Sequence, residues 1–460
     1  MEKEIPVKIG LEIHGYLDTK EKLFCLCKTD FLKEKPNSLI CPICTGQPGS
    51  KPMLPNKEAI KKLIQIALIL NCRINYEKEL FWQRKHYNWA DLPKGFQNTI
   101  SGANCSPCAE NGEYEKIRIK ECHLEEDPAQ WNPENGGINY NRSGLPLIEI
   151  VTEPDFKSSE EVVSWLSNLI HSLSYVKALR KNAGIKADVN ISTYGERVEI
   201  KNINSLEKIK KAIDYEIERQ IENYKNGIIQ KRETLAYDES KGKTIKMREK
   251  EGQEDYRFIP EPDLPPIKIT KEEIEKIKNS LPEMPSQKME KLIKKFNIDE
   301  KNAKILTKNL ALVDFFEELS KHLNVKEYIS WITIELLRVL NYNKANLDDE
   351  NVDIRPEHLA ELLKLVDKKE ITVLKAKQIM NEFFPKSFSV KEKMKEEIKK
   401  LSEEETKKLV EKVLKENEKV FEEYKKGKKE SLNFLIGQVM NLSGRRADFN
   451  LIRKIIEGEN

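Results

Sequence analysis

The amino-acid sequence predicts an α+β protein in which a domain with a largely antiparallel sheet precedes an all-helical region. Residues 1 to about 268 alternate short β-rich runs with turns of Gly, Pro and Asn. From about residue 270 the apolar residues recur with the 3.6-residue spacing of amphipathic helices. A proline-rich segment, Pro260–Pro266, lies between the two patterns and is predicted to end the first domain.

The elements of the first domain follow from local patterns. Runs of alternating or β-rich residues predict strands over 7–11, 114–120, 145–151 and 197–201. Longer stretches with helical spacing of apolar residues predict helices over 58–70 and 159–173. This mixed order is typical of an α+β domain.

The helical region divides again near Pro385. Before this point, helical spacing predicts helices that include 292–296, 310–323 and 329–340. Lysine-rich helices over 390–424 follow and lead through Gly427 to a compact end over 434–456. We therefore predict three domains, at residues 1–268, 269–388 and 389–460, the last a small helical tail.

Composition limits the class of protein. Charged residues make up 34% of the 460 residues, yet the net charge is only +3, so lysines and acids are interspersed. This balance does not by itself indicate nucleic-acid binding. No apolar run approaches the ~18 residues that cross a membrane, and no apolar signal-peptide core follows the charged start of the chain. We expect a cytoplasmic protein that does not bind a membrane.

Four cysteines have the spacing of a metal site. They form a C-x-C and a C-x-x-C pair with thirteen residues between the pairs, at Cys25, Cys27, Cys41 and Cys44. Such pairs let four thiolates close on one tetrahedral ion, which is a structural zinc site. Disulfides are the alternative, and a reducing compartment disfavours them. The loop 25–44 is therefore predicted to bind zinc.

The other four cysteines carry weaker signals. Cys105 and Cys108 form a C-x-x-C pair that could bind a metal or act in redox chemistry. Because no partner pair lies nearby, we expect two ordinary thiols in a loop. Cys72 and Cys122 are predicted to be small core residues.

Acidic and histidine side chains indicate a second metal site. The stretch His123–Asp127 places three carboxylates and an imidazole in five residues. Glu12 and His14 follow the first apolar run and would share one face of a strand. Such groups suit a hard cation that keeps waters, above all Mg²⁺ bound with a nucleotide. A solvated acidic surface is the alternative for His123–Asp127.

Common enzyme signatures are absent from the sequence. Gly242-Lys243-Thr244 is similar to the end of a phosphate-binding loop, but Tyr237 stands where that loop requires its first Gly. Neither a G-x-S-x-G elbow nor a G-x-G-x-x-G motif after a strand occurs. If the protein uses ATP, we expect acids, bases and Mg²⁺ on a sheet to hold it.

A series of ordered motifs resembles one family. The motifs occur at 9–14, at the four cysteines, and at 91–97, 123–127, 140–150, 199–205, 255–258, 261–266 and 434–440. Together they resemble the B subunits of the aspartyl/glutamyl-tRNA amidotransferases, from about residue 7 to the C-terminus. The large number of motifs in the same order makes the resemblance very specific.

The resemblance implies a function. In this family a cradle domain, here 1–268, binds the 3′ end of a tRNA misacylated with Glu or Asp and transfers the γ-phosphate of ATP to the side-chain carboxylate. Ammonia then converts the acyl phosphate to the amide, giving Gln-tRNA(Gln) or Asn-tRNA(Asn). An amidase partner, the A subunit, supplies the ammonia through a channel, and a small C subunit holds the two together.

The resemblance also implies site residues. It places a Mg²⁺ site at Glu12, His14, Glu125, Glu126, Asp188 and Glu199, and all of these except Asp188 are expected to act in catalysis. Asp188 lies in a segment that matches the family pattern more loosely. ATP phosphate or channel contacts are implied for Arg84, Lys85, Lys94, Arg142, Lys201 and Arg248.

The C-terminal tail is predicted to contact the tRNA body. Residues 391–460 contain 18 Lys+Arg and 15 Asp+Glu, so their net charge is weak support. Bases grouped near helix ends, at Lys425–Lys429 and Arg445–Arg446, are the stronger signal, because folded RNA is recognised largely by shape and phosphate position. A solvated lysine-rich helix is the alternative.

Two other functions are consistent with parts of the sequence. A catalytically silent zinc-bearing tRNA scaffold would keep the cysteines, but the acids at 12, 125, 126, 188 and 199 argue against it. An archaeal relative specific for tRNA(Gln) carries an inserted domain between cradle and helices, and the segment after Pro266 leaves no room for one. Whether Asp-tRNA(Asn), Glu-tRNA(Gln) or both is the substrate stays open.

Overall fold

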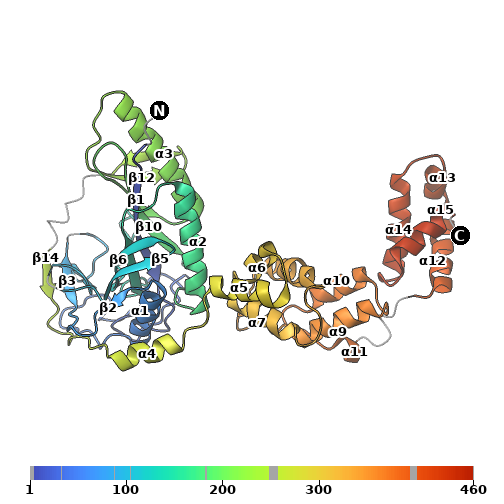
Figure 1. The fold of residues 1–460 in the computed structure, drawn as a ribbon, viewed down its shortest axis with the longest axis horizontal. Coiled ribbons are helices and arrows are strands. Elements are labelled where there is room, and N and C mark those ends of the chain that lie inside the picture. The colour runs from blue at the N-terminus through green and yellow to red at the C-terminus, as the bar shows by residue number, and fades with distance from the viewer. Residues whose placement is uncertain are drawn as a thin grey trace. The chain divides into compact units, whose positions relative to one another are not determined.

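A computed structural model of the chain describes residues 5–458 except residues 33, 88, 104, 182–183, 248–256 and 394–400 (Figure 1). The chain divides into two compact units, Met1–Met284 and Pro285–Asn460. The first combines a large sheet with helices, and the second is helical. The predicted α+β class, with a helical region after the sheet, is confirmed.

The first unit is built on a twelve-stranded sheet. Its main path runs β13-β12-β11-β10-β1-β9-β6-β4-β3-β14, with β2 paired to β5 and β5 to β6 beside it. All of these strands pair antiparallel except β11 with β12. The strands are β1 Lys8–Tyr16, β2 Arg73–Ile74, β3 Gln83–His86, β4 Phe96–Thr99, β5 Ala109–Tyr114, β6 Ile117–Glu126, β9 Pro146–Thr152, β10 Ile185–Ser192, β11 Val198–Ile203, β12 Glu233–Asp238, β13 Lys243–Lys246 and β14 Arg257–Pro260; a separate hairpin pairs β7 Gln130–Trp131 with β8 Ile138–Asn139.

Four helices of the first unit bury its apolar core. They are α1 Lys57–Ile69, α2 Ser159–Tyr175, α3 Leu206–Lys225 and α4 Lys271–Asn279. The side chains of Asn56, Ser158 and Ser205 accept hydrogen bonds from the first-turn amides of α1, α2 and α3, which explains where these helices begin. In Figure 1 they lie beside the sheet, and α1 contacts β6 while α3 contacts β10.

Alternation along the central strands decides which side chains enter this core. On β1, Ile9, Leu11 and Ile13 are at most 2% exposed and belong to the apolar core. Successive strand residues point to opposite faces, so Glu12 and His14 lie together on the other face. The predicted shared face of these two residues is therefore confirmed.

Two predicted features of the first unit differ from the structure. The run 114–120 is not one strand, because Glu115 and Lys116 adopt positive φ angles of 46° and 67° and turn the chain from β5 into β6. The proline-rich segment does not end the unit either. Ile267 and Ile274 are buried in the first core, and α4 contacts α1, so the boundary follows Met284 instead of residue 268.

The second unit contains two apolar cores. One gathers buried side chains between Leu292 and Val390, and the other gathers those between Val410 and Ile456. Thr372 on the first part donates a hydrogen bond to the carbonyl of Arg445 at 2.6 Å. The elements are α5 Pro285–Phe296, α6 Glu300–Leu306, α7 Leu310–Leu319, the π-helix η2 Trp331–Leu336, α8 Leu337–Tyr342, α9 Pro356–Asp367, α10 Val373–Glu382, α11 Val390–Lys393, α12 Glu403–Glu416, α13 Glu418–Lys425, α14 Glu430–Leu442 and α15 Phe449–Glu457.

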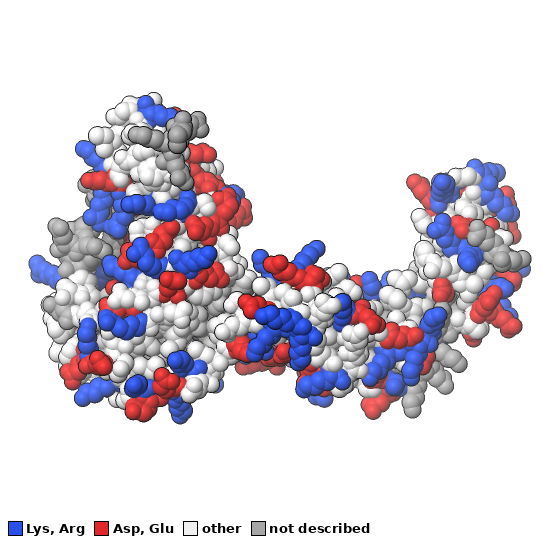
Figure 2. Space-filling view, in the orientation of Figure 1, with Lys and Arg blue, Asp and Glu red and all other residues white. Residues whose placement is uncertain are grey.

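The visible surface of each unit carries both positive and negative side chains (Figure 2). Figure 2 shows Lys and Arg side chains interspersed with Asp and Glu over the visible face of each unit. Among the described helices, none is long and apolar enough to cross a membrane. Charge on the face visible in Figure 2 therefore does not identify a site, and particular side chains are needed to identify one.

Candidate functional site

Strand register brings acidic and histidine side chains together on the face of the sheet opposite the helices. Directly opposed residues on neighbouring strands project to the same face. Glu149 on β9 is opposite both His14 on β1 and His123 on β6. Glu12 on β1 is opposite Asp188 on β10. This polar row crosses several adjacent strands that are far apart in the sequence.

His14, Glu125 and Glu149 form the first group, with ligand atoms all within 4.8 Å of one another. His14 Nε2 lies 3.6 Å from Glu149 Oε2 and 3.8 Å from Glu125 Oε1. His123 Nε2 lies 3.2 Å from the same Glu149 oxygen. Glu149 is thus the centre of this group, with a histidine on each side.

The pKa values in the first group follow from burial and from Glu149. Burial alone would raise the pKa of Glu149, but the charges of His123 and His14 hold it well below its usual range. Burial alone would lower the pKa of His14, but Glu149 raises it to about 9. Burial, and then Glu149, raises the pKa of Glu125. A carboxylate is therefore retained at the centre of a partly buried site.

Glu12, Asp188 and Glu199 form the second group, again with ligand atoms within 4.8 Å of one another. Lys201 Nζ lies 2.9 Å from Asp188 Oδ2 and also contacts Glu199. Burial, and next Glu149, raises the pKa of Glu12. Two of the three carboxylates, Asp188 and Glu199, thus share one lysine, and the influence of Glu149 on the pKa of Glu12 indicates that the two groups interact electrostatically.

Glu126 lies apart from both groups. It follows Glu125 on β6, so its side chain points to the opposite face of the strand. Its carboxylate pairs with Lys94 and accepts a 3.0 Å hydrogen bond from the backbone N–H of Asn98. The structure therefore separates Glu126 from the other five residues predicted to bind Mg²⁺, which fall into the two groups.

The predicted phosphate-binding residues also fall into two sets. Arg84 forms a two-point ion pair with Glu261, at 2.8 and 2.7 Å, and lies over the Phe96 ring. Arg84 is paired with Glu261 and Lys94 with Glu126, so neither contacts the two acidic groups in this structure. Lys201 lies within the second group, and the charge of Lys85 acts on Glu125. Arg248 lies outside the described residues.

Arg142 belongs to a buried polar cluster at the end of β1. Its Nε and Nη2 atoms donate to the two carboxylate oxygens of Asp127, at 2.7 and 3.0 Å. Tyr16 also donates to Asp127, at 3.0 Å. Burial would lower the pKa of Arg142, but Asp127 raises it. Lys186 is partly buried near this cluster, and burial lowers its pKa.

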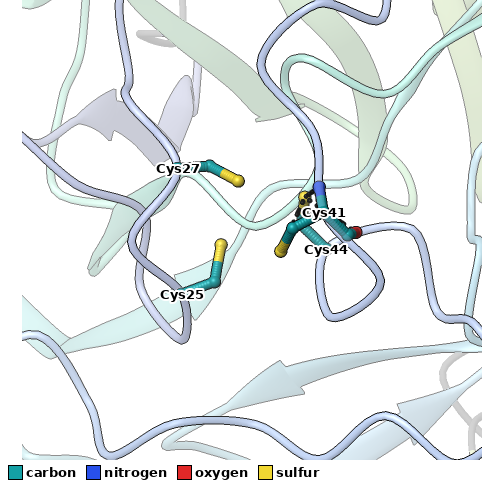
Figure 3. A group of neighbouring side chains, drawn as sticks. All are labelled: Cys25, Cys27, Cys41 and Cys44. Carbon is teal, nitrogen blue, oxygen red and sulfur yellow. Dashed lines mark hydrogen bonds between the residues drawn. The ribbon is translucent and has the colours of Figure 1, made fainter.

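The four predicted zinc ligands come together from two loop segments. Figure 3 shows Cys25 and Cys27 opposite Cys41 and Cys44, with the sulfurs pointing toward a common centre. All four Sγ atoms lie within 4.8 Å of one another, and those of Cys41 and Cys44 are 3.9 Å apart. Sulfurs bound to a tetrahedral zinc at about 2.3 Å lie roughly 3.8 Å from one another. The donor type and spacing therefore fit zinc.

Neighbouring side chains favour the thiolate form of Cys44. A hydrogen bond from Cys25, followed by the nearby charge of Lys22, lowers the pKa of Cys44. Lys22 is 1% exposed, and its Nζ lies 3.4 Å from Cys44 Sγ. Lys22 also donates to the carbonyls of Leu39 and Tyr140, at 2.9 and 3.2 Å, so it ties the cysteine loop to the sheet domain.

The remaining cysteines are free thiols. Cys72 and Cys122 are buried in the first core, as predicted. Burial raises the pKa of Cys108 to about 12 and also raises that of Cys105. Neither belongs to a possible metal-binding group among the residues that the structure describes.

Family comparisons bear on the whole chain. A model of the GatB/GatE catalytic domain matches residues 7–275, and a model of the GatB domain matches residues 314–459. A protein of Methanocaldococcus jannaschii that is named as the B subunit of aspartyl/glutamyl-tRNA(Asn/Gln) amidotransferase is 43% identical, over 97% of this chain and 96% of the relative. The chain belongs to the family of these B subunits. Relatives with the same name in Methanothermobacter thermautotrophicus and Methanococcus maripaludis are 44% and 41% identical, over 96% and 100% of this chain and 97% and 100% of their own lengths.

Membership of the B-subunit family confirms the predicted enzyme class. The enzyme is a glutamine-dependent ligase that forms Gln-tRNA or Asn-tRNA, and the chain is one of its subunits. The alternative of a catalytically silent tRNA scaffold predicted a protein that is not part of the catalytic machinery. The family match does not distinguish the individual site residues, so their roles rest on the geometry described above.

Sequence reasoning missed Glu149 and the contact of His123 with it. Glu149 lies in Leu145–Val151, an otherwise apolar run that predicts a strand and no site. A single carboxylate in such a run is a usable signal, because a buried charge requires a partner. The identity of that partner could not be read from local sequence, since His14 is 135 positions away along the chain.

Proposed function

We propose that the sheet face bearing the two acidic groups activates the side-chain carboxylate of a misacylated tRNA. An oxygen of that carboxylate attacks the γ-phosphorus of ATP, the bond to the β-phosphate oxygen breaks, and ADP leaves. Ammonia then attacks the acyl carbon, inorganic phosphate leaves with the bonding electrons, and a proton is lost to give the amide. Glu-tRNA(Gln), Asp-tRNA(Asn) or both would be the substrate.

The observation that carries this proposal is the paired arrangement of the acidic groups. Phosphoryl transfer depends mainly on positioning and charge neutralisation, and it needs no protein nucleophile. Two adjacent groups of partly buried carboxylates, one of which includes a histidine, suit this chemistry. Burial, and after it the charge of Glu149, raises the pKa values of Glu12 and Glu125, so a cation would favour their ionised forms.

The residues present fit Mg²⁺. Carboxylate oxygens of Glu12, Asp188 and Glu199 would hold one ion, and His14, Glu125 and Glu149 would hold a second. The buried Oδ1 atom of Asn190 has no hydrogen-bond partner among the described residues and lies on the residue whose amide nitrogen donates to Glu12 at 3.2 Å. Bound Mg²⁺ would supply charge neutralisation for the phosphates.

We assign different tasks to the predicted basic residues. Lys201 holds the second acidic group together and can turn one of its donors to a phosphate oxygen. Lys85 and Arg142 are candidates for binding phosphate or the tRNA end. Arg84 and Lys94 are engaged by Glu261 and Glu126, and we assign them to positioning β3 and β4.

The full enzyme is proposed to join this chain to two partners in the cytoplasm, an amidase (the A subunit) and a small protein (the C subunit). Glutamine hydrolysis on the amidase would supply ammonia to the acyl phosphate formed on this chain. The four cysteines would hold a structural zinc that orders the loop beside Lys22. A closed thiolate site leaves no position for chemistry, so the zinc would not act on the substrate.

The isolated chain should not form amide from glutamine. It should form product only with the partner subunits or with ammonium as the nitrogen source, because the proposed site has no nucleophile that could release ammonia from glutamine. The measurement is amide formation on each misacylated tRNA with ATP, comparing glutamine with ammonium, for the chain alone and for the reconstituted complex. Glutamine-dependent product from the chain alone, or no product from the complex on either tRNA, would contradict the proposed function.

Removal of the tail should weaken tRNA binding and leave the chemistry intact. The tail has its own core, and it carries a cavity of about 570 Å³ lined by both basic and aromatic side chains, including Lys425, Lys429, Phe449 and Arg453. The chain should end after Lys393, because Val390 is buried in the preceding core. Fewer phosphate contacts should raise KM for tRNA about tenfold or more and reduce the salt dependence of binding.

The tail experiment has a matched control. Lys294→Gln alters an exposed lysine of α5 that pairs with Glu290, outside the tail. Its tRNA affinity and salt dependence should equal those of the unaltered chain. If the truncated complex binds tRNA with unchanged affinity and salt dependence, the tail has no part in recognition.

A further inference from the structure

Two exposed tryptophans lie in segments that directly follow strands β3 and β6 of the sheet, and they have no role in the activation chemistry. Trp89 lies in the loop between β3 and β4, and Trp131 lies on β7 shortly after β6. Their side chains retain 48% and 37% of their accessible surface. Their ring centroids are 5.9 Å apart, with the planes at 88°, so the two indoles form one edge-to-face pair. Large aromatic surface left in water is a common mark of a binding surface.

The backbone around the pair is well braced. The amide of Ala129 donates to the carbonyl of Asp91 at 2.8 Å, which joins the two loops that carry the tryptophans. The amide of Asn132 donates to Gly137 across the β7–β8 hairpin at 2.8 Å. Asn37, from the cysteine loop, donates to the carbonyl of Ile138 at 2.9 Å. The indoles are therefore exposed on a preorganised support, which lowers the entropy cost of binding.

The chain limits how far Trp131 can lie from the site of activation. Trp131 follows Glu125 by six positions, and a chain of that length spans at most about 21 Å. Asp127, between them, is fixed by Arg142 and Tyr16. An extended ligand with its reacting group at Glu125 could therefore reach the indoles within that distance.

We propose that Trp89 and Trp131 form a stacking platform for an unpaired base at the 3′ end of the substrate tRNA. This inference rests on the proposed function, because the carboxylate to be activated is carried on that 3′ end. Single-stranded nucleotides are commonly bound by stacking on aromatic side chains, with little dependence on base identity. Such a platform suits an enzyme family named for both tRNA(Asn) and tRNA(Gln), since the platform does not need to distinguish them.

The test uses the reconstituted complex with Trp89→Ala, Trp131→Ala and Trp131→Phe. Each alanine variant should raise KM for misacylated tRNA about tenfold to a hundredfold, as expected from losing one stacked base, with kcat much less affected. Trp131→Phe should recover most of the affinity because it keeps a ring. Tyr342→Ala, which removes an 86% exposed aromatic of α8, is the matched control and should leave KM unchanged.

A second readout detects stacking directly. A tRNA whose terminal adenine is replaced by 2-aminopurine should lose fluorescence on binding the unaltered complex, and the Trp89→Ala/Trp131→Ala complex should not quench it. This readout keeps the proposal testable even if an alanine variant folds poorly. Unchanged KM in the alanine variants, or no quenching by the unaltered complex, would overturn the platform. Loss of co-purifying subunits from folded alanine variants would instead identify an interface with a partner protein and would also overturn it.

Failure of this inference differs from failure of the proposed function. If the unaltered complex forms amide and the tryptophan variants match it, only the platform is removed. If the unaltered complex forms no amide on either misacylated tRNA, the proposed activation reaction itself is wrong.

Discussion

Replacing Glu149 with glutamine should reduce ATP-dependent amide formation at least about a hundredfold, although sequence patterns did not single this residue out. Glu149 Oε2 contacts both His14, at 3.6 Å, and His123, at 3.2 Å. Glutamine keeps the shape but removes the negative charge that holds these imidazoles and completes the first group. Glu125→Ala and His14→Ala should cause losses of similar size, since each removes another member of the same group.

The measurement is amide formation from misacylated tRNA by the reconstituted complex with either glutamine or ammonium. Both nitrogen sources should show the same loss, because the defect precedes ammonia transfer. Glutamine hydrolysis by the amidase partner should persist. Near-normal amide formation by both Glu149→Gln and Glu125→Ala would show that this group does not serve the reaction.

Two controls test the division of the acids. Glu207→Gln alters an exposed carboxylate of α3 that pairs with Lys211, and it should keep normal activity. Glu126→Gln tests the residue that the structure separates from the groups. Its main effect should be a lower melting temperature, because it weakens a buried contact with Lys94. If Glu126→Gln loses as much activity as Glu149→Gln while keeping its stability, Glu126 belongs to the catalytic set after all.

Cys44→Ser should release zinc and destabilise the first unit by about 4 kcal/mol or more, the range expected for loss of a metal site. Cys44 is 4% exposed and is the cysteine beside the buried Lys22. With serine at position 44, the zinc would lose one of its four sulfur ligands and Lys22 would lose its contact with that sulfur. For a unit of this size, the melting temperature should fall by roughly 10 °C.

Metal analysis checks this result independently of activity. The unaltered chain should contain about one zinc, and Cys44→Ser should contain little. Cys105→Ser is the matched control, because Cys105 lies in the same unit and is partly buried but lies outside the four-cysteine group. It should retain zinc. Unaltered protein that lacks zinc and has a melting curve insensitive to chelators would show that the four cysteines have no structural metal.

Local sequence patterns were sufficient to predict most of the helices and strands named in the sequence analysis. The apolar spacing of α1 and α2 and the alternation of β1 were visible in the sequence, because these features depend on neighbouring residues. The cysteine spacing likewise predicted which four thiols come together. The turn at Glu115 and Lys116 was missed because neither is a usual residue for positive φ, although these two consecutive polar residues interrupt the alternation.

Period-two alternation determined that Glu12 and His14 lie on the same face of the sheet. It could not determine which residues of neighbouring strands lie opposite them. Their partners Asp188 and Glu149 are supplied by strand pairing over more than 130 positions of sequence. The same pairing placed the metal candidates in two groups and directed Glu126 to Lys94 instead. The sequence by itself thus determined the face on which each side chain lies. Only the tertiary structure decided which charges meet, because strand register is set by the burial of the whole sheet and not by any one segment.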